Sequence, residues 1–172
     1  MKYSAAVLTF ALLAPLAALS AQEKGKAKGA EKKAMKMDRA AHVVAPDQIV
    51  WGPAPASLSP GAKAVVLDGD PKKGGMFTMR LWLPDGYQVA PHFHPAAEHV
   101  TVLQGTFMVG MGDKFDESQM KELAVGTFAM VPRGMRHYAK AGGETIIQVH
   151  AMGPWRLNYV NKADDPSKSM TK

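Results

Sequence analysis

The 172-residue chain contains no cysteine. Disulfides, thiolate metal sites and cysteine nucleophiles are therefore all excluded. Long hydrophobic runs are absent too: the apolar stretch of residues 5–19 is too short and too weakly apolar for a comfortable membrane span. The sequence shows no internal repeat. Its length suits one domain with a proper core, and not two.

The net charge of +6 would suit a nucleic acid or an anionic membrane as a partner, but its distribution argues otherwise. Residues 22–40 hold seven Lys or Arg against three acids, whereas the chain from residue 41 onward holds 13 basic and 12 acidic residues. The folded part is therefore almost neutral, and the excess positive charge belongs to a tail. We expect no nucleic-acid partner.

The pattern of residues 1–21 is typical of a secretory signal peptide. Lys2 precedes the apolar run, and small residues allow cleavage after Ser20 or Ala21. No cysteine follows, so we expect no lipid at that point and no stable membrane anchor. Residues 22–45 have almost nothing to bury and are expected to form a disordered basic linker. The protein is therefore expected to be exported, either periplasmic or secreted.

Short strands at regular spacing predict an all-β domain over residues 46–162. Residues 76–83 alternate in the manner of a half-buried strand. Further strands are expected at residues 49–51, 64–67, 106–111, 125–131, 135–139 and 145–150, with a polar loop over 112–123 holding one helical turn, and a hairpin turn over 141–143. This pattern favours an antiparallel sandwich or small barrel, followed by a flexible tail at 163–172.

Three side chains that bind metals lie close together in the sequence. His92, His94 and Glu98 have the same parity, so on one extended strand they point to the same face. A fourth candidate, His137, lies downstream, and pairing of the two stretches would give three histidines and one glutamate, a sound ligand set for a divalent transition metal. The alternative is plain: a pair of histidines two residues apart is often only a polar surface face.

Turn-forming residues favour the metal site. Gly86 and Gly105 bracket the first stretch, while Pro132 and Gly134 form a tight turn just before His137. The whole pattern resembles the two signature motifs of the cupins, G-x5-H-x-H-x3-E-x6-G at residues 86–105 and G-x5-P-x-G-x2-H-x3-N at residues 126–141.

Nine of the ten specified motif positions match, the exception being Ala141, where the family usually has Asn. The resemblance implies a single antiparallel jelly-roll (cupin) barrel over roughly residues 60–160, in a small single-domain (monocupin) protein. Small cupins of this kind are commonly homodimers, and the segment around Trp51 would then supply an exchanged arm.

The resemblance also implies a site. His92, His94, Glu98 and His137 match the metal ligands, for one divalent transition metal such as Fe, Mn, Ni, Cu or Zn. Two positions then stay open for water, dioxygen or a small-molecule ligand or substrate, and Glu98 can also transfer a proton. Cupins with this set include dioxygenases, decarboxylases and sugar isomerases, so we expect a metal-dependent, oxygenase-like enzyme. The alternative is a non-catalytic cupin that binds or senses a metal or a small ligand.

Two further residues are candidates for the pocket. His150 lies at the end of a predicted strand, from which it could reach a ligand or the substrate. Tyr138 follows His137 and serves either the pocket or plain packing. His99 has the opposite parity to Glu98 and should point away from the site.

Overall fold

The computed structural model describes residue 41 and residues 43–171 of the chain, so the expected signal peptide and most of the basic linker lie outside the described residues. Within them the fold is all-β, and every strand pair is antiparallel, as the sequence predicts. The described strands are β1 (Gly52–Pro53), β2 (Lys63–Asp68), β3 (Gly75–Leu83), β4 (Gln88–Phe93), β5 (Glu98–Met111), β6 (Lys121–Leu123), β7 (Phe128–Val131), β8 (His137–Gly153) and β9 (Asn158–Tyr159).

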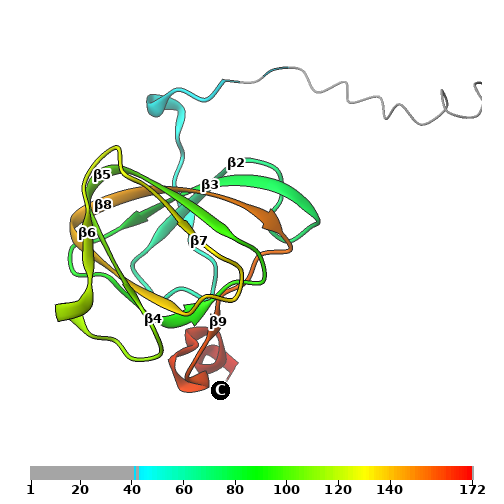
Figure 1. Cartoon of the computed structure of the whole chain (residues 1–172). Coiled ribbons are helices and arrows are strands. Elements are labelled where there is room, and N and C mark those ends of the chain that lie inside the picture. The colour runs from blue at the N-terminus through cyan, green and yellow to red at the C-terminus, as the bar shows by residue number, and fades with distance from the viewer. Residues whose placement is uncertain (1–40, 42, 172) are drawn as a thin grey trace, which may run out of the picture. The chain divides into compact units, whose positions relative to one another are not determined.

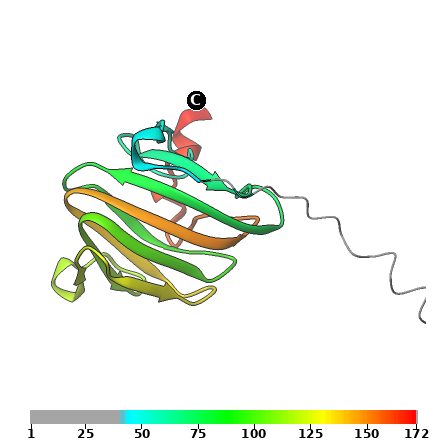
Figure 2. The ribbon, with the colours of Figure 1, turned by 90° about the horizontal axis from the view of Figure 1, so that it is seen from above.

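These strands form one sheet that curls into a half-barrel of the jelly-roll type (Figure 1). Its main path runs β1-β2-β3-β8-β4-β9, while β5 pairs with β6, β7 and β8. The 17-residue strand β8 is central, because it pairs with β3, β4 and β5. Figure 2 shows the long ribbons of β3, β8 and β5 running side by side across one wall.

The predicted hairpin turn over residues 141–143 is wrong. Strand β8 runs straight through it, with Gly142 opposite Thr106 of β5. Gly105, expected to end its strand, also lies inside β5, where the register shifts on both sides of Gln104. Gly105 and Gly143 take positive φ angles of 71° and 76°, so both bend a continuing ladder where the sequence suggested turns.

Alternation along the strands separates an inner from an outer face. On β3 the odd-numbered residues from Phe77 to Leu83 are buried, and on β8 Thr145, Ile147, Val149 and Ala151 are buried. The core packs inside the curled sheet. Ala141, at the position of the usual Asn, is fully buried and exchanges backbone hydrogen bonds with Gly86 and Tyr87, which ties the start of β4 to β8.

The shorter segments differ in detail from expectation. The loop predicted over residues 112–123 contains its helical turn, the 3-10 helix Glu117–Gln119, but its last three residues, Lys121–Leu123, form strand β6. Instead of a strand at 49–51, a 3-10 turn at Pro46–Gln48 leads into β1 at Gly52–Pro53. The C-terminal segment forms two 3-10 turns, Lys162–Asp164 and Pro166–Thr171. Among the described residues, no helix has the length and apolarity needed to cross a membrane.

Candidate metal centre

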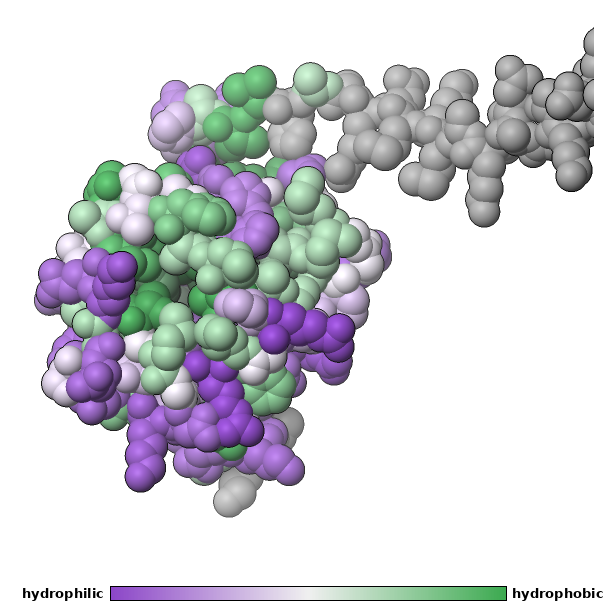
Figure 3. Space-filling view, in the orientation of Figure 1, coloured by the Kyte–Doolittle hydropathy of each residue, from purple (hydrophilic) through white to green (hydrophobic). Residues whose placement is uncertain are grey.

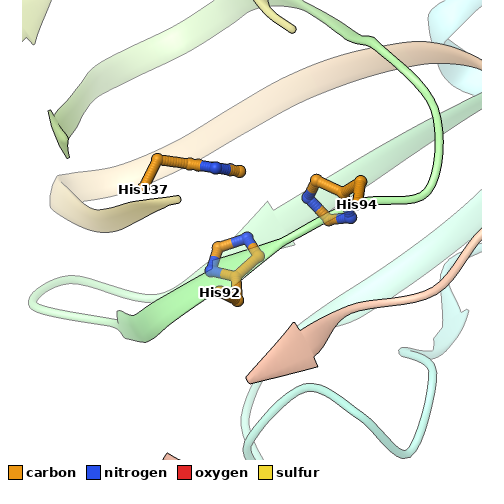
Figure 4. A group of neighbouring side chains, drawn as sticks. All are labelled: His92, His94 and His137. Carbon is orange, nitrogen blue, oxygen red and sulfur yellow. The ribbon is translucent and has the colours of Figure 1, made fainter. Parts of the chain in front are cut away.

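Three histidines meet inside the half-barrel. His92 lies on β4, His94 directly follows that strand, and His137 opens β8 as the register partner of His92. One ring nitrogen from each falls within 4.8 Å of those of the other two. All three side chains are almost fully buried, with exposed fractions of 3–4%. Figure 4 shows the three rings turned toward a common centre.

Glu98 reaches the same centre from another strand. The sequence predicted one continuous strand that carries His92, His94 and Glu98 on a single face. Instead β4 ends at Phe93 and β5 begins at Glu98, with Pro95, which has no backbone N–H for a ladder, in the bend between them. The Glu98 carboxylate still lies 3.6 Å from His94 Nε2 and 3.4 Å from His137 Nε2.

The backbone fixes the orientation of each imidazole. In every case Nδ1 lies 2.8–3.0 Å from a backbone carbonyl oxygen: His92 with Ala90, His94 with Arg156, and His137 with Met135. A carbonyl oxygen only accepts, so Nδ1 carries the hydrogen and donates it. The Nε2 atom of each neutral ring is thereby left with a free lone pair, which is the form that binds a metal.

Two of these Nε2 atoms, on His94 and His137, are buried without a hydrogen-bond partner among the described residues. A buried polar atom without a hydrogen-bond partner costs about 1–3 kcal/mol of folding free energy. Such atoms are therefore rare unless a water molecule or an ion binds them. A cation at the common centre would meet both lone pairs and face the carboxylate of Glu98. The residues present therefore fit a divalent transition metal, and the three histidines could hold such an ion.

The surroundings of His92, His94 and Glu98 shift the pKa values of these three side chains. Burial lowers the pKa of His92 to about 3, with help from the nearby His137 and His94, and burial also lowers the pKa of His94. Burial by itself would raise the pKa of Glu98, but the nearby His137, His94 and His92 outweigh it and lower that pKa. Neutral imidazoles beside an ionised carboxylate are what metal binding needs.

The cluster opens into a cavity of about 170 Å³ inside the half-barrel. Trp155 forms part of its wall and stacks on His94, with ring centroids 3.9 Å apart and an angle of 15° between the rings. No local pattern in the sequence indicates this role of Trp155. This stacking restricts rotation of the His94 imidazole.

The other pocket candidates lie elsewhere. His150 is not among the residues that line the cavity; its ring bonds to Thr78 and Gln148 on the outer face of the sheet. The reason is parity, because 13 residues separate His137 from His150 on one continuous strand, and an odd separation puts them on opposite faces. His99 is exposed and contacts Phe128, so it points away as expected.

Tyr138 does not line the cavity either, and it serves packing. It is 1% exposed, its ring lies 5.1 Å from that of Phe115, and its hydroxyl donates to the Asp116 carbonyl over 3.0 Å. The side chain therefore anchors the loop that follows β5 and makes no contact with the histidines. Its neighbour His137 faces inward because adjacent residues of a strand point to opposite sides.

The architecture around the buried histidine cluster is the cupin fold. The polyketide cyclase RemF from Streptomyces resistomycificus has a similar fold, with a TM-score of 0.62 at 18% identity over 77% of this chain and 94% of that one. An RmlC-like cupin from Shewanella frigidimarina gives a TM-score of 0.51 at 20% identity over 67% of this chain and 94% of that one. The expected cupin fold is confirmed.

Sequence comparison identifies the family. Residues 17–158 match the model of a domain of unknown function, DUF4437, and the chain belongs to this family. Germin-like protein 5-1 of rice (Oryza sativa subsp. japonica) is 34% identical over 90 residues, which are 52% of this chain and 40% of that protein. The chain thus spans about two fifths of the length of this curated relative.

Proposed function

We propose that the protein is an exported cupin that holds one divalent transition metal through His92, His94, His137 and Glu98. The observation that carries this proposal is the convergence of three Nε2 lone pairs whose imidazoles are fixed from behind by backbone carbonyls. When bound, such a metal supplies Lewis-acid or redox chemistry to a small molecule in the cavity.

An enzymatic role in an oxygen-using reaction on a small molecule is the leading form of this proposal. The site lies in a largely apolar cavity, and Glu98 Oε2, beside two of the histidines, can take up or return a proton there. RemF, whose fold is similar, is named a polyketide cyclase, so this architecture serves catalysis on small molecules in at least one protein. Fold likeness alone does not fix the reaction.

A second candidate is a cupin that binds or senses its ligand without turnover. One observation favours it: apart from the three histidines and Glu98, the only ionisable side chains in the cavity lining are Lys72 and Arg156. A second proton-transferring group is therefore lacking among the described lining residues. Product formation from candidate substrates by the metal-loaded protein would decide for the enzyme, and saturable binding without product for the sensor.

The experiment for the metal itself is elemental analysis of protein purified without chelator or affinity metal. We expect near-stoichiometric Fe, Mn, Ni, Cu or Zn in the wild type and only traces in the His92→Ala/His94→Ala variant. The matched control is His99→Ala, since His99 is exposed and points away from the cluster. Equal metal in the double variant and the wild type would refute the assignment.

Export and a homodimeric state are part of the same proposal. Exposed apolar side chains on the strands support a partner-covered face, with Met76 64%, Phe128 61%, Met152 54% and Met130 52% exposed. On the face shown in Figure 3, hydrophobic side chains gather across the middle and hydrophilic ones along the lower margin. Light scattering of the wild type and of Phe128→Glu would test the dimer, and cell fractionation would test export.

A further inference from the structure

The cavity beside the histidine cluster has a size that limits its occupant. Its volume is about 170 Å³. A protein cavity of about 150 Å³ lined by Leu, Ile and Phe is known to take up benzene. The body of a ligand here is therefore about the size of one six-membered ring.

The inner wall of the cavity is apolar. Apart from the three histidines, Glu98 and Ser57, the buried and half-buried lining residues are apolar or aromatic. Those in the interior include Met79, Leu81, Val100, Phe107, Val131 and Ile147. Apart from the histidines, Glu98, Ser57 and the indole N–H of Trp155, no hydrogen-bonding side chain among the described residues lines this interior. A polar or charged ligand body would lose its hydration there without compensation.

The exposed part of the lining differs from the interior. Only Pro55, Lys72 and Arg156 are exposed among the residues that line the cavity, so these three mark its mouth. Two of the three are cationic. The only carboxylate in the lining is Glu98, which faces His94 and His137 in the interior.

Backbone hydrogen bonds connect the two segments that carry these cations to each other and to the histidine cluster. The Trp155 N–H donates to the Pro71 carbonyl over 2.7 Å, and Arg156 and Lys72 directly follow these two residues. The Arg156 carbonyl in turn accepts the hydrogen bond from His94 Nδ1, at 2.9 Å. The mouth and the cluster are therefore parts of one connected arrangement.

The side chains of Lys72 and Arg156 lie at the mouth of the cavity. Neither side chain forms an ion pair with any residue in the described part of the chain, whereas the nearby Asp70 pairs with Lys73 over 3.3 Å and accepts the Lys72 backbone N–H over 2.9 Å. A guanidinium at the edge of an apolar cavity suits a planar carboxylate, which it can bind through two parallel hydrogen bonds.

We propose that the cavity binds a small monocarboxylate with an apolar, ring-sized body, whose carboxylate is recognised by Arg156 and Lys72. The body lies against the apolar interior and Trp155. This inference rests on the proposed function, because the same cavity contains the metal-binding cluster, and it names the class of ligand that would meet the metal.

The test compares benzoate with benzamide, which has the same shape and no charge, by titration calorimetry on the metal-loaded protein. We expect benzoate to bind at least tenfold more tightly than benzamide, the factor that corresponds to about 1.4 kcal/mol. Arg156→Gln and Lys72→Gln should each remove most of this preference and leave benzamide binding unchanged. Added salt should weaken the preference, since both cations are exposed.

The matched control is Lys73→Gln, which removes a cation from the same loop that does not line the cavity and already pairs with Asp70. Metal content is measured for every variant, because the Arg156 carbonyl, which the substitution retains, supports His94. The preference for benzoate should survive in Lys73→Gln and in wild-type protein stripped of metal by a chelator.

Three outcomes would overturn the inference: neither probe binds, benzoate and benzamide bind equally, or the preference is unaffected by Arg156→Gln. If the preference is also lost on metal removal, the carboxylate sits on the metal alone, and metal binding stands while this inference fails. If the purified wild type neither contains nor takes up a metal but still prefers benzoate through Arg156, the proposed metal centre is refuted and the ligand class is upheld.

Discussion

Replacing Gly110 by alanine should destabilise the fold through a single buried contact. Gly110 lies on β5 opposite Tyr138 of β8, and a Cβ at this position would overlap the Tyr138 ring. The ring is 1% exposed and its hydroxyl is bonded to the Asp116 carbonyl, so it cannot move aside without giving up buried surface and this hydrogen bond.

The expected loss follows from those two terms. Overpacking a filled site costs about 1–3 kcal/mol, and losing the hydrogen bond adds about 1 kcal/mol. Removing a glycine from the unfolded chain returns about 0.4–1 kcal/mol. The net loss is therefore about 1–3.6 kcal/mol, which at roughly 3–5 °C per kcal/mol for a domain of this size corresponds to a drop in Tm of roughly 3–18 °C.

The assay is thermal and urea unfolding of wild type, Gly110→Ala and the control Gly52→Ala, whose Cβ would meet only the Ala64 carbonyl at 3.7 Å. The control should unfold close to the wild type. In Gly110→Ala/Tyr138→Leu the destabilisation should be smaller than the sum of the two single variants, since the clash is removed. A Tm for Gly110→Ala equal to that of the control would show that Tyr138 does not pack as described.

Three further predictions concern the site and the fold. His94→Ala should lose most bound metal and keep its β-sheet circular dichroism, and full stoichiometric metal would contradict the ligand assignment. Glu98→Gln should weaken metal affinity by tenfold or more, because a neutral amide replaces the anionic oxygen. Competition for the metal against a chelator measures this affinity, and an unchanged affinity would exclude Glu98 as a ligand. Burial raises the pKa of Tyr87 to about 12, so the unfolded chain releases this proton from about pH 10 upward while the folded chain keeps it. Stability should therefore fall between pH 10 and 12, by about 2 kcal/mol through this group, and the fall should be shallower in Tyr87→Phe; equal slopes would contradict the burial of the hydroxyl.

Much of the barrel could be predicted from the sequence, where alternation was regular. The strands over residues 64–67 and 76–83 appear as β2 and β3 with bounds shifted by one residue. In β3 the burial alternates with period two, which leaves a direct trace in the sequence. The predicted strand ends were wrong at two glycines, Gly105 and Gly143. Gly105 and Gly143 signal a positive φ, but a turn and a bend within a continuing ladder both use it, and only the partner strand decides between them.

The same failure explains the misplaced histidine. With 141–143 taken as a hairpin, His150 fell on a separate strand whose phase relative to His137 was unknown. Because β8 is one continuous strand and the numbers of His137 and His150 differ by an odd value, His150 lies on the outer face of the sheet. The candidate ligands themselves could be found, since the spacing of side-chain types records them directly.

The groups that orient the ligands could not be found from the sequence. They are the backbone carbonyls of Ala90, Met135 and Arg156, and a carbonyl is present at every residue whatever its side chain. Trp155, Arg156 and Lys72 could not be placed at the site from the sequence either. The hydrogen bond between Trp155 and Pro71, which brings their segments together, joins parts of the chain that are far apart in sequence. Such contacts depend on the tertiary fold and leave no local pattern.

The most direct test of the account is anomalous X-ray diffraction from crystals of the metal-loaded protein, recorded at the absorption edge of the metal found by elemental analysis. We predict one strong anomalous peak inside the half-barrel, about 2.0–2.2 Å from the Nε2 atoms of His92, His94 and His137. Their Nδ1 atoms should still face the three carbonyls. A peak bound through Nδ1, or a metal located only outside this cluster, would contradict the central claim.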